Sequence, residues 1–327
     1  MTTISVIIPA YNAQHTILET IESVQQQTFK ELEIIVINDG STDQTLDKVK
    51  SIKDSRILVF DYPNSGASIA RNRGISKASG DYISFIDADD LWTKDKLEKQ
   101  LTALQNNPQA SVSYSWIAIM LENKESSADR VSYFPGKKVF FEGNIYSQLL
   151  LENFIANGSN ILAKKEAIAS IEKFDSSLKI GEDWDFYLRL AAKYCYVLVP
   201  EHQVIYRKSS TSLSTDVSNM EKDSLRIIER AYQNAPQELQ FQKNKSIARL
   251  FIICGRSYFE LNRNSQDIIE AKQRLWKSIK LDPLILFSQD TLALLVKILF
   301  EQFLPDRVGV SLISKLKKPF AIKKFRL

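Results

Sequence analysis

The segment Tyr82–Asp90 reads YISFIDADD, an apolar run that ends in three carboxylates. Aromatic and β-branched residues dominate the run, which favours a buried strand. Comparable runs recur in the first half of the chain, and we expect strands at residues 4–9, 32–38, 57–61, 82–87 and 112–120. Helical patterns lie between them, with apolar residues on one face at positions 17, 21 and 24, at 46, 49 and 52, and at 97, 101 and 104. This alternation predicts an α/β fold with a largely parallel sheet covered on both faces.

Polar and acidic residues stand at the carboxyl ends of the expected strands, the edge where ligands bind in such sheets. The first strand ends at Pro9-Ala10-Tyr11-Asn12, the second at Asn38-Asp39-Gly40-Ser41 and the fourth at Asp87-Ala88-Asp89-Asp90. No GxGxxG follows the first strand, and no GxxxxGK(S/T) is present. These absences argue against an ordinary dinucleotide-binding domain and against a P-loop NTPase.

Asp87 and Asp89 are two positions apart at the end of an apolar strand. Mg²⁺ and Mn²⁺ prefer oxygen ligands, and Mg²⁺ sites typically combine one or two carboxylates with substrate phosphates. The pair is therefore a candidate site for a divalent cation beside a nucleotide diphosphate. Alternatively, Asp89 or Asp90 only caps the helix that begins near Thr93, because Asp is a favoured N-cap residue.

Two further segments supply groups that bind nucleotides or phosphates. Asp39 either accepts a hydrogen bond from a base or ribose hydroxyl or serves only as a turn carboxylate. In Asn64–Gly74, a glycine turn, a helix start and two arginines precede the DxD strand. Helix N-termini and guanidinium groups both favour phosphate oxygens, so Arg71, and less strongly Arg73, are candidate phosphate ligands.

The segment Gly181–Leu190 places Glu182 and Asp183 in the first turn of an amphipathic helix. Acids in this position complement the helix dipole without any further role. Asp185 and Arg189 have the i,i+4 spacing of an ordinary helix ion pair. A last strand is expected at residues 195–199, before Pro200.

The composition suits a folded globular protein, with 327 residues, 44% hydrophobic and 25% charged, and a net charge of +4. Cys195 and Cys254 are far apart in apolar surroundings, so we expect buried free thiols in a reducing compartment. The N-terminus lacks a basic region followed by an apolar stretch of signal length, and residues 292–304 are too short and too charged to span a bilayer. These features favour a cytoplasmic protein without a transmembrane helix.

Beyond about residue 216 the pattern becomes almost wholly helical, which predicts a division into residues 1–215 and a helical C-terminal region, 216–327. Part of this region resembles a single tetratricopeptide unit, and one copy favours a helical appendage over a peptide-binding array. Apolar residues share a helix face ahead of a basic tail, namely Leu292, Leu295, Val296, Leu299 and Phe303. The tail either rests on an anionic membrane surface or is merely solvated.

Five motifs in this order resemble the family 2 glycosyltransferases of GT-A fold. They are Ser5–Asn12, Asn38–Asp43, Asn64–Gly74, Asp87–Asp90 and Gly181–Trp184, and the likeness covers residues 3–215. Several motifs in the right order are more specific than any one of them. The resemblance implies an inverting enzyme that uses a nucleotide-diphosphate sugar, a divalent cation (Mn or Mg) and a saccharide or lipid-linked acceptor. No nucleic-acid partner is expected.

Carried over to matching positions, the resemblance assigns a role to each candidate residue. It implies that Asp183 is the catalytic base and that Asp89 binds the metal. Donor binding would fall to Pro9, Tyr11, Asn12, Asp39, Arg71 and Asp87, with Asp39 at the nucleoside and Asp87 at the ribose or metal shell. Glu182 and Trp184 would face the acceptor.

The sequence departs from the family at one position. The family often has Tyr-Arg-x-His after the last strand, whereas here Tyr206-Arg207-Lys208 is followed by Ser209, and His202 does not replace the missing histidine. If that histidine assists the metal in relatives, coordination here is left to Asp89, phosphates and water, or to another residue.

Two other classes of protein remain as alternatives. A sugar-nucleotide pyrophosphorylase would carry a glycine-rich phosphate loop with arginine and lysine after the first strand, and Pro9-Ala10-Tyr11-Asn12 is not such a loop. A non-catalytic nucleotide-sugar-binding protein would be favoured by substituted carboxylates, but Asp39, Asp89 and Asp183 are all present.

Overall fold

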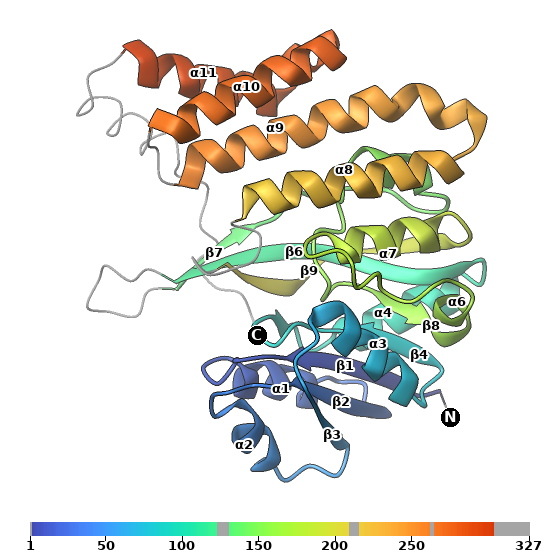
Figure 1. The fold of residues 1–327 in the computed structure, drawn as a ribbon. Coiled ribbons are helices and arrows are strands. Elements are labelled where there is room, and N and C mark those ends of the chain that lie inside the picture. Colours follow the sequence, from blue (N-terminus) through green and yellow to red (C-terminus); the bar gives the residue numbers. More distant parts are fainter. Residues whose placement is uncertain (1, 123–130, 209–215, 262–264, 304–327) are drawn as a thin grey trace.

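A computed structural model describes residues 2–122, 131–208, 216–261 and 265–303. The N-terminal two thirds form a sheet with helices on both of its faces, and the C-terminal helices stack against one side of this unit (Figure 1). The predicted α/β fold class, with a mostly parallel sheet and a C-terminal helical region, is confirmed.

The described strands form one sheet in the order β3-β2-β1-β4-β8-β6-β9-β5, with β7 beside β6. Strands β1 to β4 are parallel neighbours, β6 and β9 are parallel to each other, and the short β8 is antiparallel to both β4 and β6. The bounds are β1 Ile4–Ala10, β2 Leu32–Asp39, β3 Ile57–Tyr62, β4 Tyr82–Phe85, β5 Leu91–Trp92, β6 Ala110–Glu122, β7 Val131–Pro135, β8 Leu162–Lys164 and β9 Cys195–Lys208. Because β4 ends at Phe85, Asp87 lies in the turn that follows the strand.

Strand β9 is longer than the sequence predicts, because the expected end at Val199 is wrong. The strand continues past Pro200 to Lys208, and its pairing with β6 shifts register between Val199 and His202. Proline cannot donate to a ladder, so a strand passes it at an irregularity of this kind. The extension brings Arg207 to the acidic turn after β4.

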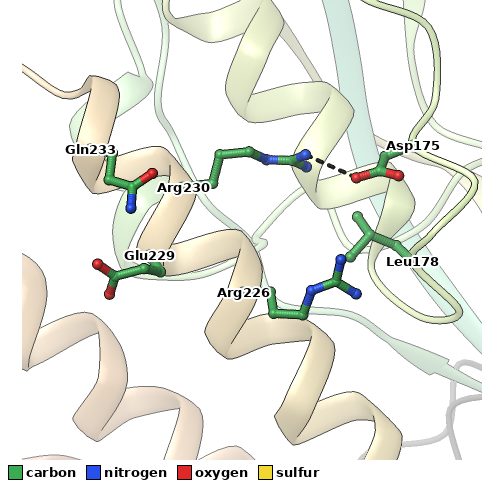
Figure 2. A pocket seen from close by; sticks show the side chains of 6 residues that line it. All are labelled: Asp175, Leu178, Arg226, Glu229, Arg230 and Gln233. Carbon is green, nitrogen blue, oxygen red and sulfur yellow. Dashed lines mark hydrogen bonds and ion pairs between the residues drawn. The ribbon is translucent and has the colours of Figure 1, made fainter.

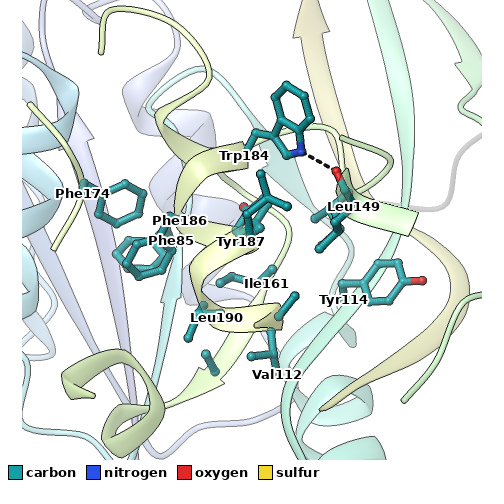
Figure 3. Close-up of a cluster of buried hydrophobic side chains, with 14 of the residues drawn as sticks. Phe85, Val112, Tyr114, Leu149, Ile161, Phe174, Trp184, Phe186, Tyr187 and Leu190 are labelled. Atoms are coloured by element: carbon teal, nitrogen blue, oxygen red, sulfur yellow. Dashed lines mark hydrogen bonds between the residues drawn. The ribbon is translucent and has the colours of Figure 1, made fainter. Parts of the chain in front are cut away.

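Helices cover both faces of the sheet, and each face has its own apolar core. One core includes side chains from α1 and α4, and the other includes side chains from α3, α5 and α7. In the second core, Phe174 stacks on Phe186 at 4.0 Å and meets Phe85 edge-on at 5.3 Å (Figure 3). The bounds are α1 Ile17–Gln25, α2 Thr45–Lys50, α3 Ala67–Lys77, α4 Lys96–Asn106, α5 Tyr146–Leu151, α6 Lys165–Ala169 and α7 Glu182–Ala191.

The described part of the C-terminal region, residues 216–261 and 265–303, is helical, as predicted, and its first helix is part of the core of the sheet unit. Ile227, Ile228 and Tyr232 of α8 are each 1% exposed and belong to the same core as α7. The later helices share a separate apolar cluster. The bounds are α8 Val217–Asn234, η2 Gln237–Gln242, α9 Lys243–Leu261, α10 Ser265–Leu281, η3 Pro283–Phe287 and α11 Gln289–Phe303. The division at residue 215 stays a prediction.

Two smaller predictions can be compared with the structure. Both cysteines are free, and Cys254 is buried as expected, whereas Cys195 is partly exposed. Among the described residues, every helix is too short or too polar to cross a bilayer. The basic tail and Ser209 lie outside the described residues.

Candidate active site

The turn after β4 holds one acid that is part of the scaffold. Asp90 is fully buried, and its carboxylate accepts hydrogen bonds from Asn157 Nδ2 at 2.9 Å, Ser159 Oγ at 2.5 Å and the Arg207 N–H at 3.2 Å. Burial and the neighbouring carboxylates of Asp89 and Asp87 raise its pKa well above the ordinary value. Asp90 therefore joins the turn to β9 and to the segment before β8.

Asp89, the predicted metal ligand, lies in a site that penalises its negative charge. Burial, followed by the Asp87 carboxylate, raises the pKa of Asp89 to about 6. Among the described residues, no side chain donates a hydrogen bond to its carboxylate, and Arg207 Nε donates instead to the Asp89 carbonyl at 3.0 Å. A carboxylate without a side-chain donor, beside a second carboxylate, fits a hard divalent cation.

The protein alone does not provide a full coordination shell. No group of three or more His, Cys, Asp or Glu residues is placed to hold a metal ion in the part of the chain that the structure describes. Asp89 and Asp87 could therefore supply one or two ligands, and donor phosphates would have to supply others, as is usual for Mg²⁺.

Arg71 has a different position from the one expected of a phosphate ligand. Its side chain is 4% exposed and bridges two carboxylates, with Nη2 2.5 Å from Asp87 Oδ1 and Nη1 2.7 Å from Glu182 Oε1. Because these acids occupy both terminal nitrogens of its guanidinium, Arg71 links the turn after β4 to the start of α7. Glu182, predicted on the acceptor side, is this second partner.

Asp183, the predicted base, is partly exposed beside that ion pair. Burial and then Glu182 raise the pKa of Asp183 to about 7, although Arg71 opposes the shift. Its Oδ1 accepts from the Trp184 N–H at 2.7 Å, and Asn153 Nδ2 lies 3.4 Å from its Oδ2. A carboxylate with a pKa near neutrality suits general base catalysis.

Asp39 lies at the end of β2, where backbone groups occupy its carboxylate. It is 2% exposed, and it accepts hydrogen bonds from the Gly66 N–H at 2.7 Å, the Ser65 N–H at 3.0 Å and Arg73 Nη1 at 2.9 Å. These contacts hold the two residues that precede α3 and Arg73 within that helix, so the turn-carboxylate alternative describes its contacts here. Contact with a nucleoside stays a prediction.

The loop after β1 is open to solvent and tied to the loop after β2. Pro9 and the following residue end β1, and Tyr11 has 53% of its surface exposed. Asn12 adopts a positive φ of 48°, and its Oδ1 accepts from the Thr42 N–H at 2.8 Å. The loop is therefore accessible to a ligand, and its contact with a nucleotide stays a prediction.

Trp184 lies in the core, unlike a residue that contacts an acceptor. It is 7% exposed, and its Nε1 donates to the Leu149 carbonyl at 2.9 Å (Figure 3). Trp184 is the third residue of α7 and lies on the buried face of that helix, which explains its low exposure. The indole anchors the first turn of α7 and so holds Asp183 in place.

Sequence reasoning did not single out the segment of residues 153–160, which contacts acids at both ends of the site. Ser159 Oγ accepts from the Asp87 N–H at 2.9 Å, and Asn153 is the neighbour of Asp183. The Asn157-Gly158-Ser159 turn signal could have marked a loop. Its partners, however, lie at least 30 residues away and are set by tertiary structure.

The backbone of this segment is strained where it meets the acids. Ala156 has a φ of 82°, and the Asn157 N–H donates to the Ile155 carbonyl at 3.2 Å, which is the pattern of a γ-turn. A Cβ at Gly158 would lie 2.8 Å from Arg71 Nη2. Glycine therefore lets the loop approach the buried guanidinium.

The raised pKa values predict a stability change with pH. Asp89 and Asp183 bind protons more tightly in the folded protein, so their contribution is fully present below about pH 4 and is lost as pH rises through 6 to 7. Asp89→Asn should therefore increase the free energy of unfolding at pH 8 by on the order of 2 kcal/mol. Urea denaturation from pH 5 to 8 measures this, with the exposed Asp47→Asn as control. An unchanged slope for Asp89→Asn would contradict the interpretation.

Comparison with known proteins identifies relatives of the whole sheet unit. The model of the family described as glycosyltransferase like family 2 matches residues 5–253. An uncharacterized glycosyltransferase of Haemophilus influenzae is 32% identical over 233 residues, covering 69% of this chain and 72% of that protein. The Escherichia coli UDP-Glc:alpha-D-GlcNAc-diphosphoundecaprenol beta-1,3-glucosyltransferase WfgD is 44% identical over 105 residues, 32% of this chain and 42% of WfgD. The chain spans 31% and 26% of the length of two Rickettsia glycosyltransferases.

Solved structures show the same fold. S. aureus TarS 1-349 in complex with UDP-GlcNAc matches with a TM-score of 0.60 and 20% identity, over 86% of this chain and 81% of that one. The mannosyltransferase PcManGT from Pyrobaculum calidifontis, in complex with GDP-Man and Mn²⁺, matches with a TM-score of 0.57 and 16% identity, over 91% and 87%. With its GT-A-type fold and a family match over most of its length, the chain belongs to the family 2 glycosyltransferases.

Proposed function

We propose that this chain is an inverting glycosyltransferase that moves a sugar from a nucleotide-diphosphate sugar to an acceptor hydroxyl, in the synthesis of a cell-surface polysaccharide or glycolipid. The observation that carries the proposal is the pairing of Arg71 with both Asp87 and Glu182. This pairing keeps the proposed donor side next to the proposed base, Asp183.

On the donor side, Asp89 and Asp87 would hold a divalent cation together with the donor phosphates. When bound, the cation would act as a Lewis acid that stabilises negative charge on the departing diphosphate. The exposed Tyr11 and the loop around it would line the nucleotide pocket. Asp39 would reach the nucleoside only with lone pairs that its contacts with α3 leave open.

On the acceptor side, Asp183 would take the proton of the attacking hydroxyl. The acceptor oxygen forms a bond to the anomeric carbon while the bond from that carbon to the diphosphate oxygen breaks, so the nucleoside diphosphate leaves. A single displacement of this kind inverts the anomeric centre. With a pKa of about 7, Asp183 can accept the proton near neutral pH and is a stronger base than an ordinary carboxylate.

The relatives support the substrate classes. TarS and PcManGT were solved with UDP-GlcNAc and GDP-Man, and PcManGT also with Mn²⁺. WfgD is named for transfer to a sugar on diphosphoundecaprenol, which supports a lipid-linked acceptor. The family match disfavours the pyrophosphorylase alternative. The site does not favour the non-catalytic alternative, because each proposed acid is present.

A donor screen tests nucleotide-sugar binding. One of the UDP-, GDP- or dTDP-sugars should raise the unfolding temperature in the presence of Mn²⁺, because ligand occupancy stabilises the folded state by about 2.7 kcal/mol at 100 times the dissociation constant. Asp89→Asn should lose the Mn²⁺-dependent part of this shift, and the control Asp47→Asn should retain it. A thermal shift assay measures both. If no sugar nucleotide stabilises the protein, the proposed donor class is wrong.

Replacing the base tests the chemistry. Asp183→Asn should keep the donor-induced thermal shift but reduce the transfer rate by about 10²–10⁴-fold, because the amide cannot take the proton. In the wild type, transfer should decline as pH falls through about 7, since Asp183 then becomes protonated. Radiolabelled transfer assays measure the rates, and NMR of the product measures the anomeric configuration. Full transfer by Asp183→Asn would remove the assigned base.

We also propose peripheral attachment of the C-terminal region to the cytoplasmic face of a membrane. Leu292, Val296 and Leu299 recur on one face of α11 and are 47%, 42% and 43% exposed, while Leu294 and Ile298 are buried. The outward apolar face precedes a segment rich in lysine and arginine, residues 307–327. Apolar contact together with cationic attraction is the usual basis of interfacial binding.

Truncation tests the membrane proposal. Without residues 305–327, the chain should lose salt-sensitive binding to vesicles of phosphatidylglycerol and phosphatidylcholine, because each nearby cation contributes about 1 kcal/mol. Vesicle cosedimentation measures binding, and vesicles of phosphatidylcholine alone are the control. Equal binding by the full-length and truncated chains would refute attachment through the tail.

A further inference from the structure

The segment that leads into α7, the base helix that carries the proposed base Asp183, is packed closely against α8. Gly181, directly before α7, has a φ of 82°, and a Cβ added there would lie 3.0 Å from Ile227 Cδ1 of α8. Only glycine adopts this conformation readily at such a close approach. The position of Asp183, two residues later, therefore depends on where α8 lies.

Two polar side chains of α8 hold the backbone of this segment. Asp223, which is 4% exposed, accepts hydrogen bonds from the Lys179 N–H at 2.8 Å and the Ile180 N–H at 3.3 Å. Arg226 donates to the Ser177 carbonyl at 3.3 Å and to its Oγ at 3.0 Å. Each contact fixes the chain within six residues of Asp183.

A third side chain of α8 contacts residues on both sides of Asp183 in the sequence. Arg230 donates to Asp175 Oδ2 at 2.8 Å through Nη1, and its Nη2 pairs with Asp185 Oδ1. Asp185 is 3% exposed, and its other oxygen pairs with Arg189, as the i,i+4 spacing predicts. Arg230 thus ties the entry segment and the first turn of α7 to the same point on α8.

These contacts replace apolar packing along part of the seam. A solvent-open pocket of about 300 Å³ lies there (Figure 2). Its lining comes from the entry segment and α8, namely Asp175, Leu178, Arg226, Glu229, Arg230 and Gln233. Because polar side chains and solvent occupy this part of the seam, hydrogen bonds and ion pairs hold the segment on this side.

We propose that Asp223, Arg226 and Arg230 of α8 form a clasp that positions the catalytic base. The inference rests on the proposed role of Asp183. The three residues do not touch the reacting groups, so they are positioning residues that act through α7. In this arrangement α8 of the C-terminal helical region adds to the contacts that Trp184 and Glu182 make with the sheet unit, and both sets position Asp183.

Arg230 gives the cleanest test, because its side chain is 40% exposed and its removal leaves the core of α8 intact. Arg230→Met should lower kcat about 10–100-fold, as expected for misplacement of a catalytic group, and should leave the donor KM within about twofold. Arg230→Lys keeps the charge and should recover part of the loss. Arg56→Met removes an arginine that pairs with Asp54 just before β3, away from α7 and α8, and as the control it should retain wild-type kcat.

A double variant separates positioning from general destabilisation. If Arg230 acts through the base, Arg230→Met should add no further loss of kcat in the Asp183→Asn background. Two outcomes would overturn the clasp but leave the proposed function intact. In the first, the losses of kcat in the two single variants multiply in the double variant. In the second, Arg230→Met retains wild-type kcat while Asp183→Asn is inactive. Full transfer by Asp183→Asn would instead remove the assigned base and the clasp with it, whereas absence of transfer by the wild type would overturn the proposed function.

Discussion

The buried guanidinium of Arg71 is the interaction on which the site depends. It has 4% of its side chain exposed and is the point at which the turn after β4 meets α7. Without it, the Asp87 and Glu182 carboxylates would share a poorly hydrated space with no counterion, which is a costly arrangement. Arg71 is carried by α3, and the two residues just before that helix, Ser65 and Gly66, donate their N–H groups to Asp39 at the end of β2. One chain of contacts thus runs from Asp39 through α3 to the base helix.

Arg71 and Arg207 together leave the acids of this site incompletely neutralised. Asp89 and Asp183 have pKa values raised to about 6 and 7, with burial as the main cause in both. This electrostatic strain lowers stability and also gives the two groups their chemistry, since one is receptive to a metal ion and the other to a proton. Strained groups of this kind cluster at functional sites because the surrounding structure holds them there.

The sequence was sufficient for β1 to β4, β6 and the first part of β9 because these strands are apolar runs, and a parallel sheet buries both faces of such strands. It also placed the acids at the strand ends. It did not predict the short strands β5, β7 and β8. It was insufficient where contacts depend on tertiary structure: nothing local indicates that Arg71 pairs with Glu182, 111 residues away, or that Ser159 contacts Asp87. Pro200 suggested the end of a strand, but pairing with β6 carries β9 past it. The role of Trp184 was inferred from a family motif, and its burial reflects its place on the apolar face of α7.

Near residue 216 the chain changes from mixed α/β to helical structure, but the apolar core that contains α7 continues across this point into α8 and α9. Helix α9 explains why, because its two faces belong to different clusters. Leu250 and Cys254 pack into the core that contains α7, whereas Ala248 and Ile252 pack with α10 and α11. Residues four apart share a helix face, so each pair forms a separate stripe. A displacement of α10 and α11 would therefore reach α8 and the base helix through one rigid element. Attachment of the C-terminal end to a surface would constrain the orientation of the active site as well as its location.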